Sequence, residues 1–295
     1  MTESQEMPEI QRVDIDFAVV ENYTSEEDFM KLAVDLLVEA GQYVCVAACL
    51  LPGDRRAWSR NEAILGGLLV RMFKLISAML DQTCQRRRET SMVMGRLAFE
   101  CVINVKYLIK HGSAETFDAY VAYSLRHERR LLDEIQKNID ARGGETLPIE
   151  RRMAASIQRS AEAAGVALDE VSKDTFKLWK DQTLYSRAEA VGMGPMYLSF
   201  IGGGSHSVHG NWQDLLEYHL DRSEGGFTPE LEWHQPRPQV LLILAIFVVD
   251  TVKDYLVHLV GEHSEPVQVE LDDLSERIWG VNDRHEAFLS ARQSA

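Results

Sequence analysis

The sequence predicts an all-α protein, an irregular bundle of about eight to ten helices in a single domain. Apolar residues recur at intervals of three and four over long segments of the chain, which is the spacing of one face of a helix. No segment combines alternating polarity with a β-branched run long enough to predict a sheet. The chain also has no repeat of fixed length and no low-complexity linker, so nothing divides it into separate domains.

Capping residues and helix-breaking residues predict where the helices of the first half of the chain begin and end. The first helix begins after Thr24 and Ser25, whose hydroxyls precede a run of carboxylates, and it continues towards Leu51. Pro52-Gly53-Asp54 then breaks it. Four further helices are expected at about 57–84, 88–110, 114–141 and 149–164. A glycine closely follows each of the last three, which is typical of a helix end.

The second half is less regular. Glycines interrupt the segment Trp179–Trp212, and residues 229–238 are rich in turn-forming side chains. A long apolar helix is expected at 240–260, and a last helix at 271–291. We expect residues 1–23 to form an acidic, partly mobile leader and residues 24–295 to form the single helical domain.

The composition is typical of a soluble globular protein. Hydrophobic residues make up 45% and charged residues 26% of the 295 positions, so a substantial core can form. The formal net charge of −15 works against non-specific binding to nucleic acid and to anionic membranes. The most apolar run, Val240–Val249, is too short to span a bilayer. The start of the chain does not resemble a signal peptide. We therefore expect a cytoplasmic protein without a membrane span, with Cys45, Cys49, Cys84 and Cys101 as reduced core thiols.

A polar stripe on the expected helix 88–110 is the first candidate site. Arg96, Glu100 and Asn104 follow one another at one-turn intervals, and the same face carries apolar residues and Tyr107. Burying such charges is costly unless they are paired. One interpretation is a buried Arg96–Glu100 ion pair that sets the helix register. Another is a site in which Arg96 binds an anion or orients a carboxylate, and a third is that both side chains face water.

The second candidate site follows three glycines. Gly202-Gly203-Gly204 precedes Ser205, His206 and His209, and glycine allows close approach to the backbone. The two histidines could ligate a metal together with a carboxylate such as Asp214. The H-E-x-x-H and G-x-S-x-G patterns are both absent, which argues against a zinc-protease site and a serine nucleophile. We expect no metal and no cofactor.

The run G-R-L-A-F-E-C-V-I-N-V-K-Y-L at 95–108 resembles the signature helix of a bacterial all-α family known as domain of unknown function 5677. The later positions Trp179, Tyr197, Ser205 and His209 are similar to that family's second block. The resemblance covers about 57–260 and implies no settled reaction. It implies that Arg96, Glu100, Ser205 and His209 form one constellation, and these are the catalytic candidates. The candidates for ligand binding are Asn104, Tyr107, Tyr197 and His206.

Two functions are compatible with these residues. The first is a non-catalytic helical module that binds an unknown protein partner or a small ligand, as a monomer or homodimer, in a setting such as stress or phage defence. The alternative is a ribonuclease or nucleotide phosphodiesterase in which His209 exchanges a proton, Glu100 orients it and Arg96 holds an anionic group. The chain is distantly similar to the HEPN (higher eukaryotes and prokaryotes nucleotide-binding) group. The arginine–histidine spacing of that group is absent, which favours the binding module and leaves enzymatic activity open.

Overall fold

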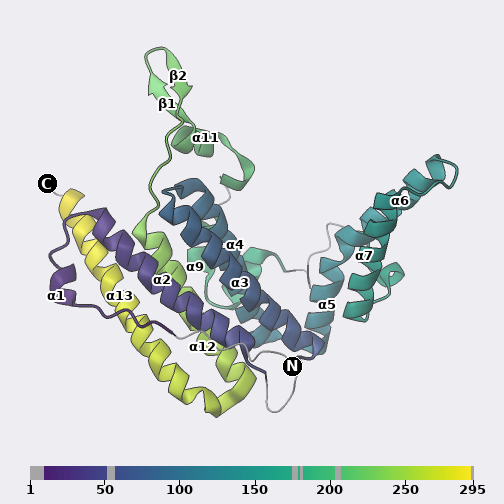
Figure 1. Ribbon diagram of the computed structural model, residues 1–295, viewed down its shortest axis with the longest axis horizontal. Coiled ribbons are helices and arrows are strands. Elements are labelled where there is room, and N and C mark those ends of the chain that lie inside the picture. Colours follow the sequence, from purple (N-terminus) through teal and green to yellow (C-terminus); the bar gives the residue numbers. More distant parts are fainter. Residues whose placement is uncertain (1–9, 52–56, 175–178, 180–181, 203–206, 294–295) are drawn as a thin grey trace. The chain divides into compact units, whose positions relative to one another are not determined.

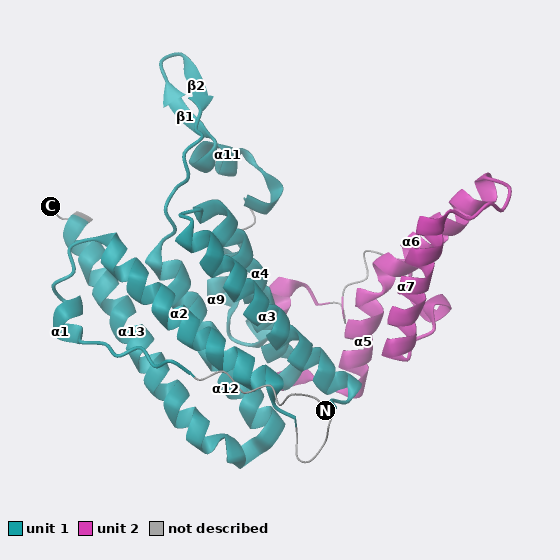
Figure 2. Cartoon of the chain, in the orientation of Figure 1, with its two compact units in different colours: residues 1–109, 188–295 teal, residues 110–187 magenta. Residues whose placement is uncertain are grey.

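The computed structural model describes residues 10–51, 57–174, 179, 182–202 and 207–293. Helices form nearly all of its regular structure (Figure 1), so the predicted all-α class is confirmed. The chain forms two compact units (Figure 2): unit 1 comprises residues 1–109 and 188–295, and unit 2 comprises residues 110–187. The predicted division into a leader and one helical domain stays a prediction.

The core of unit 1 is a bundle of long helices around α12 (Pro238–Val260). α12 packs against α2 (Glu26–Cys49) and α13 (Glu265–Gln293), and α2 packs against α3 (Arg60–Cys84). The fourth long helix, α4 (Arg88–His111), follows α3 in the chain. Most of α12 is apolar and buried, which is why the most hydrophobic helix of the sequence occupies the centre.

Capping side chains set the starts of α2 and α3. Ser25 accepts a hydrogen bond from the backbone N–H of Asp28 at the start of α2. Ser59 and Glu62 form a capping box at the start of α3. These caps satisfy backbone N–H groups that have no partner within the helix. The helix expected after Ser25 therefore begins where its capping residues predict.

Shorter elements complete unit 1. They are α1 (Phe17–Val20), α9 (Gly194–Tyr197), the π-helical turn η2 (Leu198–Gly202), α11 (Trp212–Tyr218) and η3 (Gly261–Ser264). α8 (Leu184–Ala190) spans the boundary between the units in the sequence. The last helix, α13, begins at Glu265 and not near residue 271, because η3 turns the chain directly into it.

A two-stranded antiparallel hairpin follows α11, although no sheet was expected from the sequence. β1 (Leu220–Ser223) pairs with β2 (Gly226–Pro229), and Gly225 between them has a φ of +83°. Each strand has four residues and almost every one is exposed. A strand this short and exposed carries no apolar alternation, so its glycine-containing turn is the only signal in the sequence.

Unit 2 is a separate group of helices. It contains α5 (Ala114–Ser124), α6 (Arg126–Ala141), α7 (Pro148–Ala164) and the short 3-10 helix η1 (Leu168–Glu170). α6 packs against α7 and α5 packs against α6. The indole N–H of Trp179 donates to the carbonyl oxygen of residue 116 on α5, at 3.2 Å.

The single helix predicted at 114–141 is two helices. Leu125 separates α5 from α6, with a ψ of −1°. Just before it, the hydroxyl of Ser124 donates to the carbonyl oxygen of Tyr120 at 2.8 Å. Such bonds to the preceding turn bend helices, which gives a physical reason for the break. The spacing of the apolar residues does not reveal this break between the two helices.

A buried ion pair attaches the N-terminal segment to the bundle. Glu39 on α2 is 1% exposed and Arg277 on α13 is 7% exposed. The Arg277 guanidinium also donates to the carbonyl oxygen of Val13, whose N–H donates to Glu39. The part of the predicted leader around Val13 is thus held by specific hydrogen bonds.

Two helices, α2 and α3, are long and apolar enough to cross a membrane by length and composition alone. Within their most apolar stretches, 61% of α2 and 39% of α3 is buried in the fold. A core helix of a bundle shows the same features as a membrane span by this measure. The expectation of core thiols is correct for Cys101 but wrong for Cys49 and Cys84, which are exposed.

Candidate functional site

The predicted polar stripe is present on α4, but the Arg96–Glu100 ion pair that was one interpretation of it is not. Arg96 and Glu100 are half-buried. Within the described part of the chain, neither side chain makes a hydrogen bond or an ion pair. Nε and Nη1 of Arg96 are inaccessible to solvent and have no hydrogen-bond partner. The same is true of Oδ1 of Asn104, two turns along the helix. The stripe thus contains buried polar atoms that nothing in the described chain satisfies.

Aromatic packing places this part of α4 beside η2 and α12. The ring of Phe99 stacks on Phe200 of η2, with 4.8 Å between centroids, and lies 5.3 Å from Phe247 of α12. π-helical turns such as η2 are rare and are frequently found at functional sites. Tyr197 is half-buried at the end of α9, directly before η2, and Tyr107 is buried on α4.

The segment that carries Ser205, His206 and His209 lies partly outside the described residues. Gly203, Gly204, Ser205 and His206 lie outside the described residues. His209 is exposed, and none of the hydrogen bonds or ion pairs among the described residues joins it to the α4 stripe. The constellation of Arg96, Glu100, Ser205 and His209 therefore stays a prediction.

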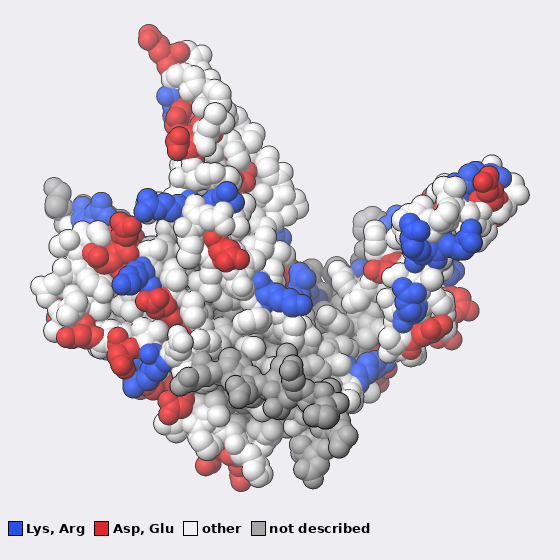
Figure 3. All heavy atoms as spheres, viewed as in Figure 1, with Lys and Arg blue, Asp and Glu red and all other residues white. Residues whose placement is uncertain are grey.

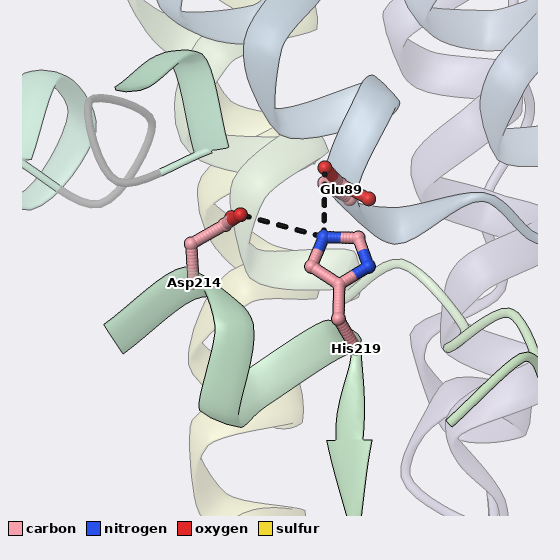
Figure 4. A group of neighbouring side chains, drawn as sticks. All are labelled: Glu89, Asp214 and His219. Atoms are coloured by element: carbon pink, nitrogen blue, oxygen red, sulfur yellow. Dashed lines mark ion pairs between the residues drawn. The ribbon is translucent and has the colours of Figure 1, made fainter. Parts of the chain in front are cut away.

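A different group of side chains meets in unit 1, where the start of α4 approaches the end of α11 (Figure 4). Nε2 of His219 lies 3.5 Å from Oε1 of Glu89 and 3.4 Å from Oδ2 of Asp214. Asp214 is buried, whereas Glu89 and His219 are partly accessible. Among the described residues, this is the one group of three side chains that could hold a metal ion.

Local structure positions each of the three side chains. Glu89 lies in the first turn of α4. Asp214 lies in the first turn of α11, where its backbone N–H donates to Oδ1 of the capping residue Asn211 at 3.2 Å. His219 is the C-terminal cap of α11, directly before β1. The change from helix to strand at His219 turns its ring back towards Asp214.

Arg88 connects the start of α4 to this region. Its guanidinium pairs with Glu217 of α11 at 3.0 Å and lies 5.8 Å from the ring centroid of Tyr218. Its backbone N–H donates to the carbonyl oxygen of His234 at 3.0 Å. These contacts hold α11 and the segment after the hairpin next to Glu89.

A cavity of about 270 Å³ opens beside His219. It is lined by Glu89, Tyr218, His219, Glu230, Leu231, Glu232, Trp233 and His234. Acidic side chains gather along the hairpin, and basic side chains lie where it joins the bundle (Figure 3). Hydrogen bonding to Glu230 raises the pKa of Asp221, and the backbone N–H of Glu232 lowers the pKa of Glu230. The cavity is therefore acidic and partly aromatic.

The sequence contains no strong signal for this group. Asp214 and His219 are five positions apart, which does not place two side chains on one helix face. They meet because α11 ends between them. Glu89 comes from a distant part of the sequence, and only the packing of α4 against the α11 region brings it there. The metal alternative considered from the sequence combined Asp214 with His206 and His209, whereas the structure places it beside His219.

A model of a family of unknown function (DUF5677) matches residues 62–227. The chain belongs to this family. The match covers both the α4 stripe and the Glu89–Asp214–His219 group, and it confirms the resemblance seen in the sequence. No curated protein and no solved structure matches the chain. The distant similarity to the HEPN group is not shown by these comparisons.

Proposed function

We propose that this DUF5677 protein is a non-catalytic helical module that binds an anionic ligand, a carboxylate or a phosphate, through Arg96 of α4. The observation that carries the proposal is that two buried guanidinium nitrogens of Arg96 have no partner among the described residues. Leaving a buried donor unsatisfied costs about 1–3 kcal/mol, and more for a charged group. Separate ligand oxygens that accept from Nε and from Nη1 would remove this cost, since the N–H groups of these two nitrogens lie on different edges of the flat guanidinium.

Asn104 adds a second requirement for the chemical groups of the ligand. Its buried Oδ1 accepts from no donor in the described part of the chain, so a ligand that reaches both residues needs an N–H or O–H group as well as an anionic group. Their Cα atoms are separated by two helical turns, about 12 Å along the axis. A nucleotide, a short peptide or a segment of a protein partner has these groups at such a separation, whereas inorganic phosphate reaches Arg96 alone.

The catalytic alternative has less support. A ribonuclease or phosphodiesterase site would need a proton-exchanging group beside Arg96, and His209 is exposed and joined to neither Arg96 nor Glu100 by a described hydrogen bond. The net charge of −15 also disfavours the phosphate backbone of RNA. We further propose a cytoplasmic location and a role such as stress or phage defence, as expected from the sequence.

The experiment is a binding titration of the full-length protein with phosphate, AMP and a glutamate-containing dipeptide by isothermal calorimetry. We expect wild-type protein to bind at least one of these anions, and Arg96→Met to bind it at least tenfold more weakly. Arg152→Met is the matched control, because Arg152 is exposed on α7 in unit 2 and should leave binding unchanged. Equal affinity of wild type and Arg96→Met, or no binding of any probe at millimolar concentration, would contradict the proposal.

A further inference from the structure

The distances around His219 are longer than those of ordinary hydrogen bonds and are compatible with ligands of one metal ion. Nε2 is separated from the two carboxylate oxygens by 3.4 and 3.5 Å, whereas N–H···O hydrogen bonds usually measure about 2.7–3.2 Å. Two ligand atoms on a tetrahedral ion with bonds of about 2.1 Å are about 3.4 Å apart. The three ligand atoms all lie within 4.8 Å of one another, so one ion could reach all of them.

A second observation comes from Asp214 itself. Its side chain is 2% exposed and points at His219 (Figure 4). Its Oδ1 is buried and has no hydrogen-bond partner among the residues that the structure describes. In the described part of the chain no lysine or arginine pairs with Asp214 or with Glu89, and His219 is their shared neighbour. A buried carboxylate needs a counter-charge, and a dication would supply it.

We propose that Glu89, Asp214 and His219 bind a divalent transition-metal ion of the zinc class. One imidazole nitrogen and two carboxylate oxygens suit such an ion better than calcium or magnesium, which prefer oxygen ligands alone. Three protein ligands leave a coordination position open in a four-coordinate site. Glu89 and His219 both line the cavity beside them, so water or a small anionic molecule could reach an ion held there.

The site is independent of the function proposed for Arg96. The two sites use different residues, and the metal would be held where α11 and the hairpin meet α4. A metal there would join these elements, so its binding should also raise the thermal stability of the protein by mass action. The competing interpretation is a protonated His219 that forms ion pairs with both carboxylates and binds no metal.

The test uses the full-length protein after removal of metals with EDTA. Zn²⁺ is titrated by isothermal calorimetry, and Co²⁺ is added as a spectroscopic probe of the coordination sphere. We expect one Zn²⁺ per chain, a higher melting temperature, and visible Co²⁺ bands. His219→Ala and Asp214→Asn should each weaken Zn²⁺ binding at least about tenfold, since even outer-shell changes at metal sites cost about 10–100-fold.

The control is His209→Ala, which removes an exposed histidine outside the group and should bind Zn²⁺ as wild type does. His219 is 42% exposed, so His219→Ala removes little packing, and circular dichroism checks that each variant is folded. If Asp214→Asn does not fold, Glu89→Gln takes its place. The proposal is overturned if wild type binds no stoichiometric Zn²⁺, or if folded His219→Ala retains wild-type affinity.

Discussion

Arg277 on α13 donates to both carboxylate oxygens of Glu39 on α2, at 2.8 and 2.7 Å, with both side chains buried. The same guanidinium donates to Oδ2 of Asp273 at 2.8 Å and to the carbonyl oxygen of Val13 at 2.9 Å. One two-point ion pair therefore joins two helices of the core and the extended segment before α1. It is a buried pair of the kind expected at Arg96 and Glu100, located elsewhere in the fold.

Removing the Glu39 carboxylate should destabilise the protein strongly. Glu39→Ala leaves Arg277 buried with one remaining carboxylate neighbour, Asp273, and breaking a buried pair in this way costs about 3–5 kcal/mol. Urea denaturation followed by circular dichroism measures the change in the free energy of unfolding. Glu286→Ala, an exposed residue on α13, is the control and should change it by less than about 0.5 kcal/mol. A loss below about 1 kcal/mol for Glu39→Ala would show that this pair adds little.

Removing the Arg96 charge should stabilise the protein, whereas removing the Glu39 carboxylate should destabilise it. In anion-free buffer, Arg96→Met replaces an unpaired, half-buried guanidinium by an apolar side chain, so we expect the free energy of unfolding to rise by about 1–3 kcal/mol. Urea denaturation without and with the bound anion measures it. Wild type should regain stability when the ligand is added, and Arg96→Met should not. If Arg96→Met is destabilised without ligand, Arg96 has a structural role that the described contacts do not show.

The start of α7 in unit 2 should loosen in acid. A hydrogen bond from Arg142, and a second from the backbone N–H of Leu147, lower the pKa of Glu150 from its usual 4.5. A carboxyl whose pKa is lower in the folded state than in the unfolded state stabilises the fold. This stabilisation is complete above the pKa of the unfolded state, and it is lost as the pH falls through the pKa of the folded state. The protection of amides in Pro148–Ala164 against hydrogen exchange, measured relative to the intrinsic rate at each pH, should therefore fall below about pH 4.5.

Glu150→Gln is the variant that tests the assignment. An amide does not titrate, so exchange in the first turn of α7 should be fast at neutral pH and lose the acid-dependent step. Glu145→Gln, an exposed neighbour, should keep the wild-type profile. An unchanged acid-dependent step in Glu150→Gln would assign the transition to another group.

The cysteines should separate into two classes of reactivity. Burial raises the pKa of Cys101 to about 11, so at pH 7.5 almost none of it is the reactive thiolate. Cys49 and Cys84 are exposed and should react with a disulfide reagent in the folded protein. Mass spectrometry of the labelled peptides, before and after unfolding in guanidinium, gives the readout. Labelling of Cys101 at the rate of Cys84 in native protein would show that the α4 face is not closed as described.

The candidate sites were predictable to different degrees. The stripe of Arg96, Glu100 and Asn104 lies on one helix, so its spacing is visible in the sequence. Whether its members pair depends on the neighbouring elements η2 and α12, which the spacing does not specify. Glu89 and His219 share no element, and the hairpin after His219 is too short and exposed to show a strand pattern.

The sequence by itself determined the helical class and the positions of the long helices, because apolar periodicity and capping residues act within a single element. It also determined the family, through motifs on α4. The tertiary structure alone decided that Glu39 pairs with Arg277 and that Asp214 faces His219 and Glu89. It also decided that Nε and Nη1 of Arg96 have no hydrogen-bond partner among the described residues. Such contacts depend on packing between segments that are distant in sequence, and burial makes the presence or absence of each partner energetically important.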